Sequence, residues 1–177
     1  MKTHGKQSVV ASVAAAAGLA ILLASDLPTY VGAGKCKGCH RTNSQGRQYP
    51  IWESTKHAQA FNNFKTEAAK TIATDAGVTG TPEQSPACLK CHAPQAEKAP
   101  PLAEEGITCE VCHGPGSAYK KLNVMMNHNE AAKNGLIPYA STDSVRTFCL
   151  NCHANAHGKT FDFASAWESV KHPKPGN

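Results

Sequence analysis

Eight cysteines and four of the nine histidines in this 177-residue chain fall into one five-residue pattern, Cys-x-x-Cys-His. Two thiols at this spacing lie about one helical turn apart, where they can add to the two vinyl groups of a haem as thioethers. The histidine that follows then binds the iron as its proximal ligand. The pattern predicts four covalently attached haem c groups. The predicted attachment residues are Cys36, Cys39, Cys88, Cys91, Cys109, Cys112, Cys149 and Cys152, and the predicted proximal ligands are His40, His92, His113 and His153.

Two other uses of cysteine fit part of this pattern. The pairs Cys88/Cys91 and Cys109/Cys112 have seventeen residues between them, which matches a zinc ribbon. Eight cysteines would also suffice for a disulfide framework in an exported protein. Neither alternative explains why a histidine follows every pair, so haem attachment is favoured.

Four spare histidines, one for each predicted iron, remain once His4 is assigned to an export signal. They are the predicted distal ligands His57, His128, His157 and His172. Two histidines on every iron would fill both axial positions, an arrangement that suits electron transfer better than substrate binding. The alternative is an iron with an open position, which would allow an enzyme acting on nitric oxide, hydroxylamine or nitrite.

The surroundings of the spare histidines differ. His57 shares a helical face with apolar residues, and His172 closes an apolar stripe, so both suit a haem wall. His128 lies in a polar loop, where Met125 or Met126 could ligate instead or the histidine could be ordinary surface. His157 follows His153 by four residues and must serve a different haem or none.

The N-terminus predicts export. Lys2 and Lys6 precede an apolar stretch from Val9 to Ala24 that is short for a membrane crossing. We predict a signal peptide at 1–24, a linker at 25–35 and a tetrahaem cytochrome c domain at 36–177. An uncleaved anchor is the alternative, but no stable membrane anchor is expected. The predicted location is periplasmic or extracellular.

Short helices must position the motifs, because Pro and Gly interrupt the chain repeatedly and no segment predicts a strand. We expect one helix from Pro50 towards Ala73, and others at 129–134, 143–153 and 162–171. Aromatic residues make up only 6% of the chain, so protein side chains alone would build a small core. The predicted fold is mainly α with little regular secondary structure, packed around four haems.

The formal charge of +5 does not predict nucleic-acid binding. Removing Lys2 and Lys6 leaves about +3, and four haems would contribute roughly −8 from propionates and about +4 from ferric cores. No basic patch is interleaved with aromatic residues. The expected partners are therefore other redox proteins.

Several longer motifs resemble a known group. They are Tyr30-Val31-Gly32, Trp52-Glu53-Ser54-Thr55-Lys56-His57-Ala58, the run from Gly106 to Ser117 that contains Gly114-Pro115-Gly116, and Val170-Lys171-His172-Pro173. Together they are similar to the tetrahaem cytochrome c-554 family. The resemblance implies a helical fold with closely stacked haems that transfers electrons in a respiratory chain. It extends to tetrahaem subunits of OmcE-type extracellular filaments, so self-assembly is a second expectation.

The same resemblance implies a set of axial pairings. His57 would serve the third haem, a histidine between the third and fourth motifs the first, and His172 the fourth. Family members often carry a histidine where this chain has Tyr119, so His128 would take that role. The founding member leaves one haem five-coordinate, whereas His157 could complete the second haem here.

The motif count generates a first prediction. The intact mass of the mature protein should exceed that of the cleaved polypeptide by four haems, because each motif forms two thioether bonds. Mass spectrometry of the denatured protein measures this directly. A mass increase of three haems or fewer would contradict it.

Overall fold

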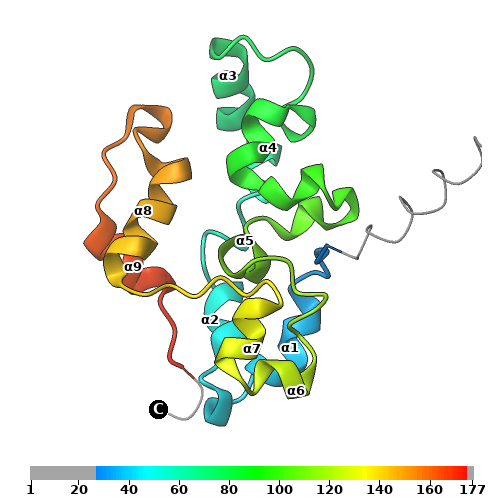
Figure 1. The fold of residues 1–177 in the computed structure, drawn as a ribbon. Coiled ribbons are helices and arrows are strands. Elements are labelled where there is room, and N and C mark those ends of the chain that lie inside the picture. Colours follow the sequence, from blue (N-terminus) through cyan, green and yellow to red (C-terminus); the bar gives the residue numbers. More distant parts are fainter. Residues whose placement is uncertain (1–26, 175–177) are drawn as a thin grey trace, which may run out of the picture.

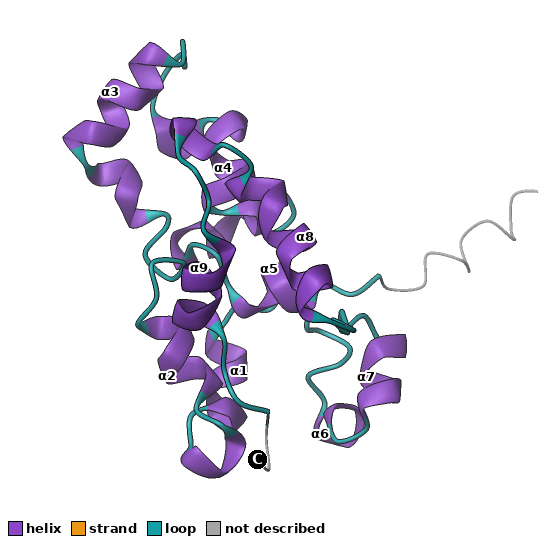
Figure 2. Ribbon diagram, turned by 90° about the vertical axis from the view of Figure 1, so that its left-hand side faces the viewer, coloured by secondary structure: helices purple, strands orange, loops and turns teal. Residues whose placement is uncertain are grey.

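Helices and irregular connections make up the part of the chain that the structure describes. The computed structural model describes residues 27–174, in which no strand occurs (Figure 2). This confirms the expectation of a mainly α fold with much irregular chain. The predicted signal peptide lies outside the described residues. Within them, no helix has both the length and the apolar character needed to cross a membrane.

The described helices are short and form local groups. The α-helices are α1 (Gly34–His40), α2 (Gln48–Glu53), α3 (Glu67–Asp75), α4 (Pro86–His92), α5 (Cys109–His113), α6 (Leu122–Met125), α7 (His128–Lys133), α8 (Thr142–His153) and α9 (Phe163–Val170). The 3-10 helices are η1 (Asn43–Gln45), η2 (Asn62–Lys65), η3 (Pro82–Gln84), η4 (Pro94–Glu97), η5 (Pro100–Glu105) and η6 (Ala156–Gly158). Figure 1 shows α3 and α4 at one end, α1 and α2 at the other, and α5 between them.

Local sequence signals explain where the later helices begin. At α8, the Ser141 side chain accepts a hydrogen bond from the Ser144 amide, and the Ser144 hydroxyl oxygen accepts one from the Ser141 amide. At α9, the Asp162 side chain accepts a hydrogen bond from the Ala164 amide and so caps the helix. Observed α7, α8 and α9 lie within one residue of the helices predicted at 129–134, 143–153 and 162–171. Those three predictions are confirmed.

The single helix predicted from Pro50 towards Ala73 is wrong. The chain instead forms α2, a turn region, η2 and α3. At the end of α2, the Ser54 hydroxyl donates to the Ile51 carbonyl and the Thr55 hydroxyl donates to the Trp52 carbonyl. These side-chain bonds compete with the helical backbone ladder and end the helix.

The apolar core is small, as the composition predicts. Its members are Ala33, Ala60, Phe64, Ala73, Ala93, Ala96, Ile107, Tyr119, Ala131 and Phe163, most of them alanine. The largest fully buried side chains are polar: Gln95, Thr108 and Glu110. Because alanine buries little area, this core supplies only a modest part of the apolar burial that a domain of this length needs.

A close backbone contact holds the His57 segment against the chain that enters α5. The indole Nε1 of Trp52 donates to the Ile107 carbonyl at 2.7 Å, and the Ile107 amide donates to the His57 carbonyl at 2.9 Å. Gly106 makes this approach possible because a Cβ at its position would lie 2.6 Å from the His57 carbonyl oxygen. Its φ of +69° also favours glycine.

We therefore predict that Gly106→Ala destabilises the protein more than Gly77→Ala. Gly77 has a φ of +68°, but a Cβ there would meet no atom within 4 Å, so it is a control for a glycine with positive φ and no steric overlap. Gly77→Ala should lose about 1 kcal/mol because of its positive φ. Gly106→Ala should lose about 1–3 kcal/mol from its backbone, because a φ of +69° with a ψ of −134° is a conformation that residues other than glycine rarely adopt. Gly106→Ala should lose about 1–3 kcal/mol more from overlap. Denaturant unfolding followed by circular dichroism measures the difference, and equal losses would contradict the contact.

Candidate functional site

Every Cys-x-x-Cys-His motif lies at the carboxyl end of a short helix. The helices α1, α4, α5 and α8 each end at the histidine of their motif. Residues three and four apart share one face of a helix, so each motif presents its two thiols and its imidazole together. No disulfide joins any of the eight motif cysteines, and Cys39 alone among them is exposed.

The motifs approach one another in the order first, third, fourth, second. Thiols of the first and third motifs lie close enough to shift each other's pKa, and a thiol of the second motif raises the pKa of one in the fourth. The third and fourth motifs are close enough for their thiols to interact electrostatically. These three approaches join Cys36 with Cys109, Cys152 with Cys91, and Cys112 with Cys149. Each motif therefore has at least one other motif beside it.

Burial raises the pKa of several motif thiols. It raises the pKa of Cys112 to about 11 and that of Cys152 to about 12, and neighbouring thiols add to both shifts. Zinc sites need thiolate ligands that converge on one point. In residues 27–174, no group of three or more His, Cys, Asp or Glu side chains converges in this way. The geometry does not support the zinc-ribbon alternative.

Hydrogen bonds orient two of the proximal histidines. Nδ1 of His92 lies 3.0 Å from the carbonyl oxygen of Ala60, and Nδ1 of His40 lies 3.2 Å from Oε1 of Gln48. A carbonyl oxygen can only accept, so Nδ1 of His92 carries the proton and its Nε2 keeps a free lone pair. In both rings Nε2 is the nitrogen left for iron, with the Nδ1 contact fixing the ring.

The other two proximal histidines are set by their surroundings. Burial, followed by the neighbouring His172 and His40, lowers the pKa of His113 to about 4. The ring is therefore uncharged at neutral pH, which is the form that binds a metal. His153 stacks on Phe161 with ring centroids 4.6 Å apart, and burial lowers its pKa as well.

Three of the four spare histidines lie opposite a motif histidine. Two imidazole nitrogens that bind one iron at about 2.0 Å place their ring centroids roughly 6 Å apart. The observed centroid separations match this value. The residues present fit a haem with two histidine ligands at three motifs. The ring centroids are 6.0 Å apart for His57 and His153, 6.3 Å for His157 and His92, and 5.9 Å for His172 and His113.

Two of these neighbouring ring pairs differ from the pairings that the family resemblance implies. His57 lies opposite the fourth motif instead of the third, and His172 lies opposite the third instead of the fourth. The position of the C-terminal tail explains the second change. Nε2 of Gln48 donates to the Pro173 carbonyl at 2.9 Å and holds the tail beside the first motif, which neighbours the third. His172 therefore lies beside the third motif and not beside the fourth.

His157 faces the second motif, in agreement with its predicted inability to serve the adjacent His153. The chain reverses in a tight turn in which Asn155 and His157 both adopt left-handed backbone, with φ of +55° and +52°. Such a conformation costs about 1–2 kcal/mol for a residue other than glycine. Strain of this kind at a candidate ligand is typical of functional sites.

His128 stands apart from the other spare histidines. It begins α7 and is exposed, and within the described residues no histidine ring lies opposite it. His40 of the first motif is correspondingly the proximal histidine without a spare histidine facing it in that part of the chain. Met126, one of the alternative ligands, is 80% exposed. The structure therefore leaves the first motif with its distal side unassigned.

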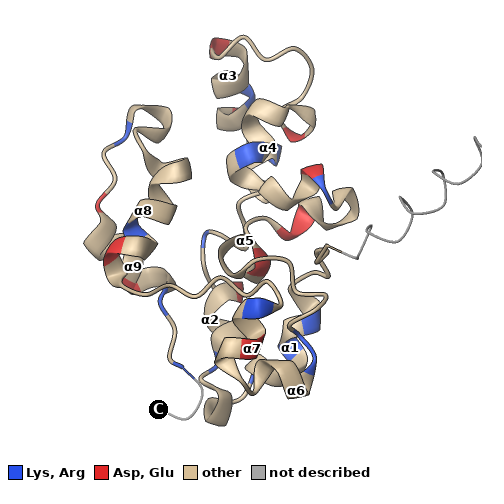
Figure 3. Ribbon diagram, viewed as in Figure 1, with Lys and Arg blue, Asp and Glu red and all other residues tan. Residues whose placement is uncertain are grey.

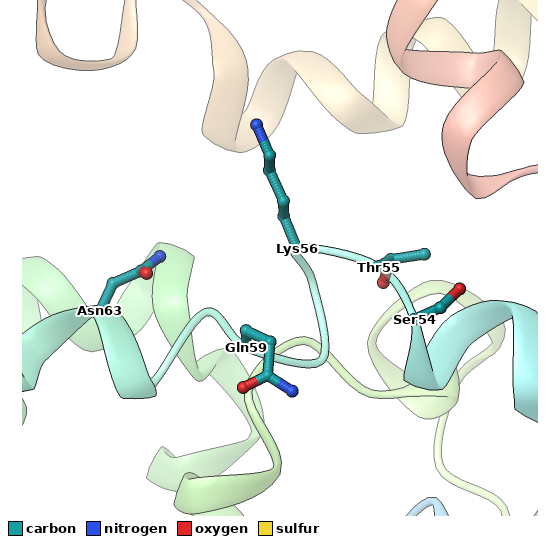
Figure 4. A pocket seen from close by; sticks show the side chains of 5 residues that line it. All are labelled: Ser54, Thr55, Lys56, Gln59 and Asn63. Atoms are coloured by element: carbon teal, nitrogen blue, oxygen red, sulfur yellow. The ribbon is translucent and has the colours of Figure 1, made fainter.

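An open hollow of about 400 Å³ adjoins the His57 segment. Its lining is polar and consists of Ser54, Thr55, Lys56, Gln59 and Asn63. Figure 4 shows Lys56 extending away from the other four side chains into the open space. An exposed cation beside a predicted distal ligand could meet an anionic group, but no catalytic set of acid and base residues lines the hollow.

Two contributors to the site were not predicted from the sequence. Gln48 contacts both the His40 ring and the C-terminal tail. Glu110, inside the third motif, is buried and binds backbone amides that precede the first motif. Neither residue type is part of the haem-attachment pattern, so the sequence offered no signal beyond the position of Glu110 between two cysteines.

Comparison with known proteins gives two matches. The profile of the family described as "Cytochrome c554 and c-prime" matches residues 35–114. The chain is also 27% identical over 173 residues to cytochrome c-554 of Nitrosomonas europaea. That alignment covers 85% of this chain and 66% of the relative, so this chain spans slightly less than two thirds of the relative's length. No solved structure matches the chain.

The histidine separations generate a prediction about spin state. Replacing His57 by Ala should leave one ferric iron with an open or weakly ligated position, and therefore high-spin. Lys56→Ala, the matched control from the adjacent position in the hollow, should leave every iron unchanged. Electron paramagnetic resonance of the oxidised protein quantifies both.

A double-cysteine variant identifies which haem is affected. In a protein that lacks the fourth attachment through Cys149→Ser and Cys152→Ser, adding His57→Ala should produce no new high-spin signal. A high-spin signal that persists there would assign His57 to another motif and overturn the observed pairing.

Proposed function

We propose that this chain is a tetrahaem electron carrier with two histidines on each iron. The premise is its assignment to the cytochrome c-554 family, which the family match and the similarity to cytochrome c-554 support. The coarser statement, a c-type cytochrome in electron transfer, follows from the family. The number of haems and the identity of their ligands are part of the proposal.

The observation that carries the proposal is the set of three histidine pairs with ring centroids 5.9–6.3 Å apart. A haem whose two axial positions are both filled by histidine exchanges electrons without binding substrate. When bound, each haem supplies a one-electron change between ferric and ferrous iron. The protein's contribution is to hold the histidines at that separation.

The order of the motifs supports a carrier. First, third, fourth and second motifs succeed one another through neighbouring thiols, so groups attached at these sulfur atoms would form one series. The first and second motifs lie at the two ends of that series. In Figure 1 their helices, α1 and α4, lie towards opposite ends of the described chain. Electrons could therefore be accepted at one end and released at the other.

The charged side chains do not gather into one face that would select a nucleic acid or a single strongly charged partner. Figure 3 shows Lys and Arg interspersed with Asp and Glu over the described helices. The three ion pairs within residues 27–174 are exposed contacts along single helices, such as that of Lys70 with Glu67. This distribution supports partners that are other redox proteins.

The first motif distinguishes a carrier from an enzyme. The proposal assigns His128 to the first haem within the same chain, since it is the spare histidine left after the three pairs. If no histidine fills this position, the first haem has an open side, and the alternative is an enzyme acting on a small nitrogen compound. The same motif bears on assembly, because an exposed His128 could instead serve a haem in a neighbouring copy of the chain.

The setting completes the proposal. The predicted export signal supports a periplasmic or extracellular location, where the partners would be other redox proteins. Assembly into a filament would require His128 to bind between chains. The exposed apolar side chains beside it, Leu122 at 68% and Met126 at 80%, form a small patch at most. We therefore favour a discrete carrier over a filament.

One experiment separates these alternatives. Electron paramagnetic resonance of the oxidised wild-type protein should show low-spin iron throughout, and a high-spin signal equal to one haem per chain would overturn the carrier. His128→Ala should convert one iron to high-spin without changing the size of the particle. Size-exclusion chromatography and electron microscopy provide the second readout. Polymers of the parent that disperse in the variant would instead establish the filament.

A further inference from the structure

Glu110 is a charged side chain buried inside the third motif. It lies between Cys109 and Cys112, is only 1% exposed, and is among the largest fully buried side chains of the described protein. Burying a carboxylate is costly unless hydrogen bonds or a cation compensate for the lost water. The three ion pairs in residues 27–174 all involve other carboxylates, so no Lys or Arg neutralises Glu110 there.

Backbone amides replace water around this carboxylate. The Val31 amide lies 3.0 Å from both of its oxygens, the Gly32 amide donates at 2.7 Å and the Gly116 amide at 2.6 Å. Every donor is an N–H group, so both oxygens act as acceptors, as in an ionised carboxylate. These bonds satisfy the group but leave its negative charge in place.

The surrounding chain is shaped to admit this carboxylate and a second one. A Cβ at Gly116 would lie 3.0 Å from Oε1 of Glu110, and a Cβ at Gly32 would lie 2.8 Å from Oε1 of Glu105. Oε2 of Glu105 accepts from the Ala33 amide at 2.8 Å. Two carboxylates from the segment before and within α5 thus hold residues 31–33, which lead directly into α1.

The consequence is a fixed link between two motifs. Cys36 follows the clamped residues by three positions, and its thiol lies close enough to that of Cys109, the residue beside Glu110, for each to shift the pKa of the other. One side chain therefore joins the approach to the first motif with the body of the third. It also places a negative charge close to both, which a hydrogen-bonding amide such as glutamine would not do.

We propose that Glu110 is a positioning residue for electron transfer that holds the first and third motifs together and, through its buried charge, lowers the reduction potentials of the haems attached there. The inference rests on the proposed function, because it requires haems at both motifs. The physical reason is Coulombic: a fixed negative charge opposes the addition of an electron nearby, and little water screens it in this buried place. Glu105, which is half-buried and beside Ala33, should act in the same sense on the first haem alone.

The test is a set of glutamine variants in the holoprotein, with spectroelectrochemical titration as the readout. Glu110→Gln should move two of the four reduction potentials to more positive values and leave the other two unchanged. Glu105→Gln should move one. Glu104→Gln, a neighbour without a hydrogen bond to residues 31–33, should move none.

Gly116→Ala separates the charge from the clamp. This variant crowds Glu110 but keeps its charge, so it should lower the unfolding temperature while the four potentials stay near wild-type values. If Glu110→Gln lowers the unfolding temperature and moves no potential, Glu110 is a structural clamp only and the proposal is overturned. If Glu110→Gln does not accumulate, Glu105→Gln decides, and an unchanged first potential would overturn the proposal.

Failure of the proposed function is recognised separately. Intact mass and spin state are measured on the wild type and on each variant before titration. A wild-type protein without four haems, or with an open iron, would contradict the tetrahaem carrier whatever Glu110 does. Four low-spin haems whose reduction potentials are the same in Glu110→Gln as in the wild type would contradict only the proposal about Glu110.

Discussion

Each five-residue motif has to present two thiols and one imidazole from a single stretch of helix, and the described chain satisfies this requirement by ending a helix at the motif histidine four times. The requirement is local, which explains why the helices are short. It also limits how the chain can continue, because each of these helices ends at its motif histidine and the chain leaves it there. At α5 this exit is Gly114, with a φ of +82°. The rest of the architecture connects four such helix ends and brings other histidines opposite them.

A second constraint is the small amount of apolar side chain. Alanine dominates the buried apolar residues, and the largest fully buried side chains are polar. Groups attached covalently at the motifs would add apolar surface where the protein has little of its own. Stability and redox chemistry would then come from the same four places, so that losing one attachment would weaken the fold as well as interrupt the series of sites.

Local patterns in the sequence predicted the parts of the structure that depend on local chemistry. The motifs, the three C-terminal helices and the small core could all be inferred, because spacing, capping and composition act over a few residues. The break after α2 was missed because two hydroxyl groups, on Ser54 and Thr55, compete with the helix. The partners of His57 and His172 could not be inferred, since they depend on where distant segments pack. Glu110 was missed for the same reason: its amide donors at Val31 and Gly32 lie far earlier in the chain.

The tail that Gln48 holds beside α1 has a consequence for the order in which the protein can be made. The histidine opposite the third motif is residue 172, and the hydrogen bond that Gln48 donates to the carbonyl of Pro173 holds this part of the tail in place. A ribosome that has just completed residues 109–113 has still to add nearly all of the remaining chain before this site has both its imidazoles. During synthesis the third site is thus the last of the three paired sites to receive its second imidazole. A chain that ends before residue 172 lacks the histidine that lies beside His113 of the third motif.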